Sequence, residues 1–186
     1  PQSEGLKKNY DMARAVARFI QIPDSVIEKT IASFRGLEHR LEFVKTVSEI
    51  SFYNDSAATN PEAVAAAIRT IQTPLVLIAG GKDKKLNYRP LADAIRESSH
   101  IQAVILIGEN RKKIEKELNT YNKKLSIVLT SDVEEAVNVA RRTAESLVKK
   151  HESEVSILFS PGAASFDMFK SYADRGEQFK KIVHNL

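Results

Sequence analysis

Three short segments combine the kinds of side chain that bind small anionic ligands. They are residues 54–60, 80–85 and 160–167, in which asparagine, aspartate, serine, threonine and lysine occur among small residues. Hydroxyl, amide and ammonium groups donate hydrogen bonds, and free backbone N–H groups at the start of a helix attract negative charge. A molecule with carboxylate or phosphate groups would suit these segments if the fold brought them together.

Each segment also has a structural explanation. Asn60 can cap a helix that begins at Pro61, and Ser165 can cap another. The glycines and lysines of residues 80–85 can form a flexible basic turn. This segment is not a phosphate-binding loop, because the chain contains neither Gly-x-x-x-x-Gly-Lys-Ser/Thr nor Gly-x-Gly-x-x-Gly. Composition alone therefore leaves both a binding role and a structural role open.

Hydrophobic spacing predicts the elements that would position these segments. Apolar residues three and four apart predict two helices near the N-terminus, and alternation through Leu41, Phe43 and Val47 predicts a strand that turns at Ser48-Glu49. Strands and helices then alternate along the chain. The predicted helices are residues 9–20, 24–34, 61–71, 90–96, 110–118, 133–149 and one beginning near Ser165, and the predicted strands are residues 41–47, 50–53, 75–79, 103–107, 126–129 and 155–159.

This alternation predicts an α/β fold. Short apolar runs without polar alternation are typical of strands that are covered on both faces. Strands that alternate with helices predict a doubly wound, mostly parallel, Rossmann-like sheet, preceded here by two helices too short to enclose a core. Ligands of such sheets bind beyond the carboxyl ends of the strands. Each of the three polar segments follows a predicted strand, so we expect them to lie at one edge of the sheet.

Composition narrows the class of protein. The chain has 186 residues, of which 42% are hydrophobic, and no apolar run of the roughly 20 residues that span a bilayer, so a soluble globular protein is expected. The absence of cysteine excludes thiol nucleophiles and thiolate metal sites. The net charge is +4, but acidic residues occur among the basic clusters, which favours a solvated surface over a nucleic-acid interface.

Four motifs in a fixed order cover nearly the whole chain. They read GLEHRLE (36–42), FYNDSAATNP (52–61), IAGGKDK (78–84) and LFSPGAASFDMF (158–169), the last running on to RGEQF (175–179). Together they resemble the Mur ligase family, and within it the members that add D-glutamate. The last motif is the most specific, because members that add other amino acids carry different sequences there.

The resemblance implies a function and a domain organisation. Residues 1–36 would be the helical tail of a central ATPase domain, and residues 37–186 a C-terminal domain that binds the incoming amino acid. The full-length protein would be a cytoplasmic, monomeric ligase of peptidoglycan synthesis that uses ATP and Mg²⁺ to join D-glutamate to UDP-N-acetylmuramoyl-L-alanine through an acyl phosphate. ATP and Mg²⁺ would be bound mostly by the central domain. This chain alone, without a phosphate loop, is expected to be inactive.

The resemblance also implies roles for individual residues, none of them a metal ligand. Positions that match the family's motifs are predicted to be catalytic (Lys84, Thr59 and His39), to bind D-glutamate (Thr59, Lys84, Ser165, Phe166 and Tyr172) or to bind the nucleotide (Asn9, Arg40 and Asp55).

Two motifs depart from the family pattern. The family's motif Asp-Ser-Lys-Ala-Thr-Asn appears here with Ala57 in place of the lysine, which removes a cation directed at the transferring group. The family's His-Asn-x-x-Asn retains only Asn9 here, because Lys8 replaces the histidine and Met12 replaces the second asparagine. These departures keep two alternatives open: a non-catalytic ligand-binding module derived from the family, or a relative that ligates another acidic amino acid.

Overall fold

A computed structural model describes residues 4–120, 125–151 and 153–186 and divides the chain into two compact units, with the boundary after Leu37. In chain order the elements are α1 (Glu4–Phe19), α2 (Asp24–Ser33), β1 (Glu42–Val47), β2 (Ile50–Asn54), α3 (Pro61–Thr70), β3 (Leu75–Gly80), α4 (Arg89–Glu97), β4 (Ile101–Ile107), α5 (Arg111–Leu118), β5 (Ser126–Leu129), α6 (Val133–His151), β6 (Val155–Phe159) and α7 (Tyr172–His184). None of the helices in these ranges is long and apolar enough to cross a membrane.

The first unit is a hairpin of two helices, as predicted. Arg14 Nε pairs with Glu28 Oε1 at 2.7 Å, and the rings of Tyr10 and Phe34 meet edge to face with centroids 6.2 Å apart. Large apolar side chains remain exposed on these helices, Phe19 most of all. The hairpin therefore does not bury its own apolar surface, which agrees with the expectation that two short helices cannot enclose a core.

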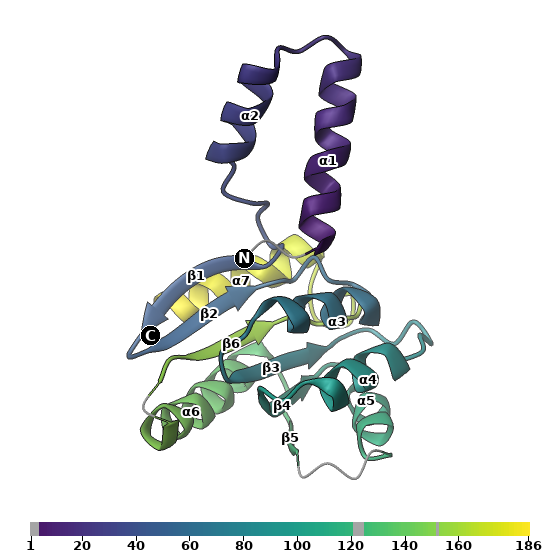
Figure 1. Cartoon of the computed structure of the whole chain (residues 1–186). Coiled ribbons are helices and arrows are strands. Elements are labelled where there is room, and N and C mark those ends of the chain that lie inside the picture. Colours follow the sequence, from purple (N-terminus) through teal and green to yellow (C-terminus); the bar gives the residue numbers. More distant parts are fainter. Residues whose placement is uncertain (1–3, 121–124, 152) are drawn as a thin grey trace. The chain divides into compact units, whose positions relative to one another are not determined.

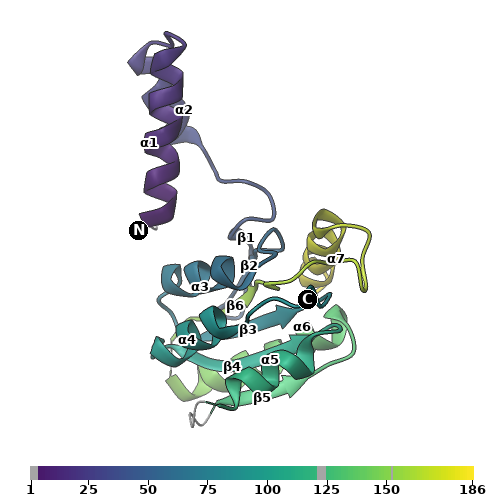
Figure 2. The ribbon, with the colours of Figure 1, turned by 90° about the vertical axis from the view of Figure 1, so that its right-hand side faces the viewer.

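The second unit is a six-stranded sheet covered by helices on both faces (Figure 1). The strand order is β1-β2-β6-β3-β4-β5, with β1 antiparallel to β2 and all other neighbours parallel. Helices α3, α4 and α5 pack on one face and α6 and α7 on the other, and each face has its own hydrophobic core (Figure 2). The predicted doubly wound, mostly parallel α/β sheet is confirmed.

Several local signals act as the sequence predicts. Ser48 and Glu49 form the two-residue turn between β1 and β2 with φ of 49° and 63°, the positive values that match the twist of a tight hairpin. The Asn60 side chain accepts a hydrogen bond from the backbone N–H of Ala63 at 2.8 Å and caps α3, whose first residue is Pro61. The β2 strand and α3 are thereby fixed on either side of the first polar segment.

Two strand predictions were wrong in detail. Phe43 was expected on the buried face of β1 but is 56% exposed, because the register with β2 shifts between Phe43 and Lys45 and turns Val44 and Val47 to the core instead. β5 was expected to be covered on both faces. It is an edge strand paired only with β4, and it is partly exposed along its length.

The helix predicted to begin near Ser165 was also placed wrongly. Residues 160–171 form an irregular loop, and α7 begins at Tyr172, where the Ser171 hydroxyl accepts a hydrogen bond from the backbone N–H of Asp174. Ser165 instead accepts turn hydrogen bonds from Met168 and Phe169 through its carbonyl. A serine caps a helix only if the residues after it continue as a helix, and here they do not.

Candidate functional site

Three loops meet at the carboxyl edge of the sheet: the β2 loop (residues 55–60), the β3 loop (81–88) and the β6 loop (160–171). Because β6 lies between β2 and β3, its loop runs between the other two. Backbone hydrogen bonds join Gly162 N to Ala58 O at 2.9 Å on one side and Lys82 N to Ala164 O at 2.8 Å on the other. The expected convergence of the three polar segments is therefore present in the structure.

Asp55 anchors the β2 loop from inside. Its carboxylate accepts hydrogen bonds from the Ser160 hydroxyl at 2.6 Å and from the backbone N–H of Leu41 at 3.1 Å. Burial raises the pKa of Asp55 from 3.8 to about 6, and the hydrogen bonds from Ser160 and Leu41 and the charge of Arg40 only partly oppose this effect. Asp55 is predicted to contact the nucleotide, and the same carboxyl group holds the β2 and β6 loops together.

The raised pKa of Asp55 predicts a pH dependence of stability. Because the folded state binds the proton more tightly than the unfolded state, the contribution of this group is fully present below pH 4 and is lost as pH rises to about 6. The loss should amount to at most about 3 kcal/mol in the free energy of unfolding. Asp55→Asn should remove it, because the amide does not ionise, while its oxygen still accepts from the Leu41 N–H and its NH2 can donate to the Ser160 oxygen. Urea unfolding of both proteins from pH 4 to 7 measures the difference, and parallel pH curves would contradict the prediction.

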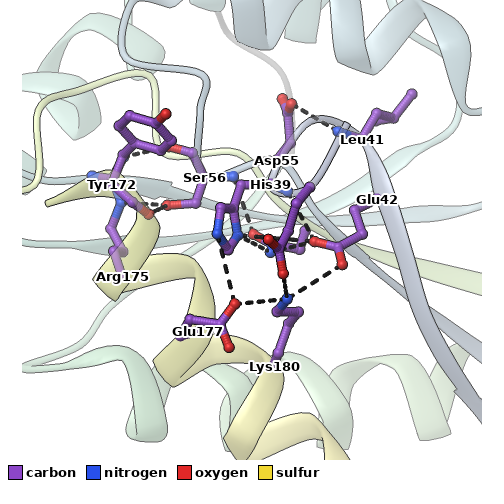
Figure 3. Close-up of polar contacts among 11 residues, drawn as sticks. His39, Leu41, Glu42, Asp55, Ser56, Tyr172, Arg175, Glu177 and Lys180 are labelled. Atoms are coloured by element: carbon purple, nitrogen blue, oxygen red, sulfur yellow. Dashed lines mark hydrogen bonds and ion pairs between the residues drawn. The ribbon is translucent and has the colours of Figure 1, made fainter. Parts of the chain in front are cut away.

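Arg175 ties the β2 and β6 loops to α7. Arg175 is 0% exposed. Its guanidinium donates to the Ser56 hydroxyl at 2.9 Å and to the Ser56 carbonyl at 2.8 Å, and the Ser56 hydroxyl donates in turn to the Tyr172 carbonyl at 2.8 Å (Figure 3). The guanidinium also donates to the Ala163 carbonyl at 3.0 Å. Burial lowers the pKa of Arg175 to about 10, against an upward effect of Asp167, so the group stays charged at neutral pH. One buried cation therefore fixes two of the three loops.

The side-chain amide of Asn54 fixes the tautomer of His39. Asn54 Nδ2 donates to Glu42 at 3.0 Å and lies 2.9 Å from His39 Nδ1, while Asn54 Oδ1 accepts from Ser56 N at 3.2 Å. An amide nitrogen can only donate, so His39 Nδ1 accepts and its proton is on Nε2, which lies 3.7 Å from Glu177. His39 is 5% exposed. The catalytic role predicted for His39 stays a prediction, and it would require this tautomer to change before Nε2 could accept a proton.

Glu38, His39 and Glu177 form a group with the spacing of a metal site. The Lys180 ammonium occupies the space between the carboxylates, bonding to Glu38, to Glu177 at 2.7 Å and to Glu42 at 3.4 Å (Figure 3). Burial lowers the pKa of Lys180, but the hydrogen bonds to Glu177 and Glu38 outweigh it and the pKa lies above its ordinary value. The Lys180 ammonium already bonds to both carboxylates of this group and His39 Nε2 carries a proton, so the group does not fit a divalent metal.

Gly176 lets His39 pack directly against α7. A Cβ at position 176 would lie 2.3 Å from His39 Nδ1. Gly176→Ala is therefore expected to lower the free energy of unfolding by about 1–3 kcal/mol, although Gly→Ala inside a helix normally raises it by about 1 kcal/mol. His39→Ala should cancel the clash, so a double-mutant cycle by urea unfolding should give a favourable interaction term. Additive effects of the two substitutions would contradict this account.

The structure places the predicted D-glutamate residues on the three joined loops and at the first residue of α7. Thr59, Lys84 and Ser165 lie on the β2, β3 and β6 loops respectively. Within the described part of the chain, their hydroxyl and ammonium groups form no hydrogen bond or ion pair with other side chains, although Ser165 is only 2% exposed. Phe166 and Tyr172 are largely exposed at the same edge, at 68% and 49%. The geometry thus leaves these polar groups available to a ligand.

The residues predicted to bind the nucleotide do not all lie on the three joined loops. Arg40 is exposed next to buried His39, and Asp55 lies beneath the β2 loop. Asn9 is an exposed residue of α1 in the other unit, so the geometry of the three loops does not bear on it.

Residues 39–148 match the family model described as Mur ligase, glutamate ligase domain. The chain belongs to the Mur ligase family. Among curated relatives, it is 38% identical to a UDP-N-acetylmuramoylalanine-D-glutamate ligase of Clostridium tetani and 41% identical to one of Caldanaerobacter subterraneus, with 97% and 96% of the chain aligned. It spans only 39% and 38% of the length of these relatives.

Solved structures share the fold of this Mur ligase chain. UDP-N-acetylmuramate-alanine ligase of Thermotoga maritima matches with a TM-score of 0.65 and 15% identity, covering 100% of this chain and 39% of that one. Folylpolyglutamate synthase of Mycobacterium tuberculosis, solved with ADP and AMPPCP, matches with a TM-score of 0.67 and 14% identity, covering 90% and 37%. At these identities the comparison supports the fold alone.

Sequence reasoning missed two residues that shape the site of this Mur ligase domain. Arg175 lies in the RGEQF segment, for which the resemblance implies no role, and Asn110 is predicted only to begin a helix. A signal for Arg175 exists, because it is spaced by fours with Phe179 and Val183 on the buried face of α7. Asn110 offers no comparable signal, since its partners lie on another loop.

Proposed function

We propose that this chain is the amino-acid-binding part of an ATP-dependent ligase that adds D-glutamate to UDP-N-acetylmuramoyl-L-alanine in peptidoglycan synthesis. The observation that carries the proposal is the joining of the β2, β3 and β6 loops, which carry Thr59, Lys84 and Ser165 respectively, three residues whose polar side-chain groups have no side-chain partner in the described part of the chain. The names of the curated relatives support the same substrate.

In the proposed reaction, the terminal carboxylate of the muramoyl substrate attacks the γ-phosphorus of ATP, which gives an acyl phosphate and ADP. The amine of D-glutamate then attacks the acyl carbon, phosphate leaves, and the nitrogen loses a proton as the amide forms. The role of this domain is to bind and orient D-glutamate, with the Lys84 ammonium facing one carboxylate and Thr59 and Ser165 donating to the substrate. ATP and Mg²⁺ would be held mostly by parts of the protein outside this chain, and the reaction would take place in the cytoplasm.

The test is ADP release by the full-length protein that contains this chain. With UDP-N-acetylmuramoyl-L-alanine and ATP present, D-glutamate should stimulate release, whereas L-lysine, diaminopimelate and D-alanyl-D-alanine should not. Indifference to D-glutamate would refute the substrate assignment. Stimulation by another acidic amino acid in its place would identify a relative with a different specificity.

One observation favours a second candidate, a non-catalytic ligand-binding module. Ala57 stands where the family pattern has a lysine, so a cation expected near the transferring group is missing. Such a module should bind D-glutamate, measured by calorimetry, while the full-length protein releases no ADP in its presence.

A further inference from the structure

One buried side chain joins the two ends of the β3 loop. Asn110 is the residue before α5. Its side-chain Oδ1 accepts a hydrogen bond from the backbone N–H of Gly81 at 2.8 Å, and its backbone N–H donates to the Gly81 carbonyl at 3.0 Å. Its Nδ2 donates to the hydroxyl of Tyr88 at the other end of the loop. Asn110 is 1% exposed and Tyr88 is buried as well. A single amide therefore sets the distance between the first and last residues of the loop.

The backbone around Asn110 is adapted to this contact. Gly80 has a φ of +113°, and a Cβ there would lie 2.1 Å from the Ile107 carbonyl and 3.2 Å from Asn110 Oδ1. Only glycine adopts this conformation without strain and leaves room for the amide. β3 and β4 can consequently approach closely at their carboxyl ends, where the loop begins.

The ion pairs of the β3 loop constrain it less than the buried amide of Asn110. Lys82 pairs with Glu109 at 2.7 Å and Asp83 with Lys113 at 3.2 Å, but all four side chains are substantially exposed, so each pair contributes little. Hydrogen bonds shielded from water hold their geometry better, because breaking them leaves buried polar groups unpaired. The backbone bond from Lys82 N to Ala164 O ties the start of the loop to the β6 loop, and Asn110 is the buried side chain that holds both of its ends.

We propose that Asn110, together with Tyr88, is the positioning residue that holds Lys84 where it can meet a carboxylate of the incoming amino acid. The proposal rests on the ligase function proposed above and deepens it. Lys84 is exposed and has no side-chain partner among the described residues, so its location depends on the backbone of the β3 loop. Asn110 touches no substrate; it acts through that backbone.

Three variants of the full-length protein separate the contacts of Asn110. Asn110→Leu removes both side-chain hydrogen bonds at similar volume, and Tyr88→Phe removes only the one at the far end of the loop. Asn110→Asp keeps both, because a carboxylate accepts from the Gly81 N–H and from the Tyr88 hydroxyl. Asn119→Leu, at the exposed residue that follows the last residue of α5, is the matched control.

Steady-state kinetics and hydrogen exchange of the same proteins provide the two measurements. Asn110→Leu should raise the KM for D-glutamate about tenfold or more, with the KM for ATP unchanged and kcat altered less than about threefold. Tyr88→Phe should give a smaller rise, and Asn110→Asp and Asn119→Leu less than about twofold. Amide exchange of residues 81–88 should accelerate in Asn110→Leu and stay slow in Asn110→Asp.

The outcomes distinguish this proposal from the ligase function. If Lys84→Met raises the KM for D-glutamate but Asn110→Leu does not, the positioning role is overturned and the ligase function stands. Unchanged exchange of residues 81–88 in Asn110→Leu overturns it too, and does so without any assay of activity. If the unsubstituted protein shows no release of ADP with D-glutamate, it is the proposed function that fails.

Discussion

Ala57→Lys is expected to raise the rate of D-glutamate-dependent ADP release by the full-length protein by about 10²- to 10³-fold. The reason is that an ammonium group would be restored where the family pattern directs one at the transferring group. Ala57 lies on the β2 loop and is partly exposed, and its backbone N–H donates to the His39 carbonyl at 2.9 Å, so a longer side chain can extend from a fixed backbone. Initial rates at saturating substrates measure the effect.

The control for this substitution is Ala66→Lys. Ala66 is exposed on α3, so the same change in charge is made away from the joined loops. It should leave the rate within about twofold, since a distant exposed charge is largely screened by salt. A large rise with Ala57→Lys alone supports a ligase whose site has lost one cation. No rise with either variant favours the binding module.

Arg175→Ala should have the largest effect on stability, lowering the free energy of unfolding of the chain by about 3–5 kcal/mol. The substitution leaves the carbonyls of Ser56 and Ala163 without their donor inside the protein and creates a cavity beneath two loops. Arg175→Lys should lose less, because an ammonium group can still reach one or two of these acceptors but lacks the planar fork of the guanidinium. Urea unfolding followed by circular dichroism measures both.

Lys181→Ala provides the comparison on the same helix. Lys181 is exposed, and its removal should change the free energy of unfolding by no more than about 0.5 kcal/mol. If Arg175→Ala costs as little as Lys181→Ala, the hydrogen bonds of Arg175 do not stabilise the loops. If Arg175→Ala does not fold, Arg175→Lys tests the prediction instead. A decrease in its free energy of unfolding below about 0.5 kcal/mol would contradict the prediction.

The order of elements and the place of the site could be predicted because both depend on signals that are close in sequence. The Ser48-Glu49 turn, the Asn60 cap and the apolar runs of β3, β4 and β6 act over a few residues. Alternating strands and helices then require a parallel sheet, and a parallel sheet puts the ends of its strands on one edge. The predicted residues Thr59, Lys84 and Ser165 followed from that rule and from the resemblance together.

What could not be predicted depends on partners distant in sequence. The bulge in β1 that exposes Phe43 arises from pairing with β2, and the exposure of β5 arises from its place at the edge of the sheet. Ser165 looked like a helix cap, but the β6 loop that contains it is bonded to the β3 loop, which competes with a helix at that point.

The sequence by itself determined that this chain is an α/β domain whose three polar segments follow strands and therefore lie at the carboxyl edge of the sheet, because hydrophobic periodicity and motif order can be read without knowing any long-range contact. Only the tertiary structure decided how the site is held. Arg175 bonds to Ser56 across 119 positions of sequence and Asn110 bonds to Gly81 across 29, and such pairs form because strand order places their loops side by side. A side chain's type indicates which bonds it can make, whereas the fold decides with which residue.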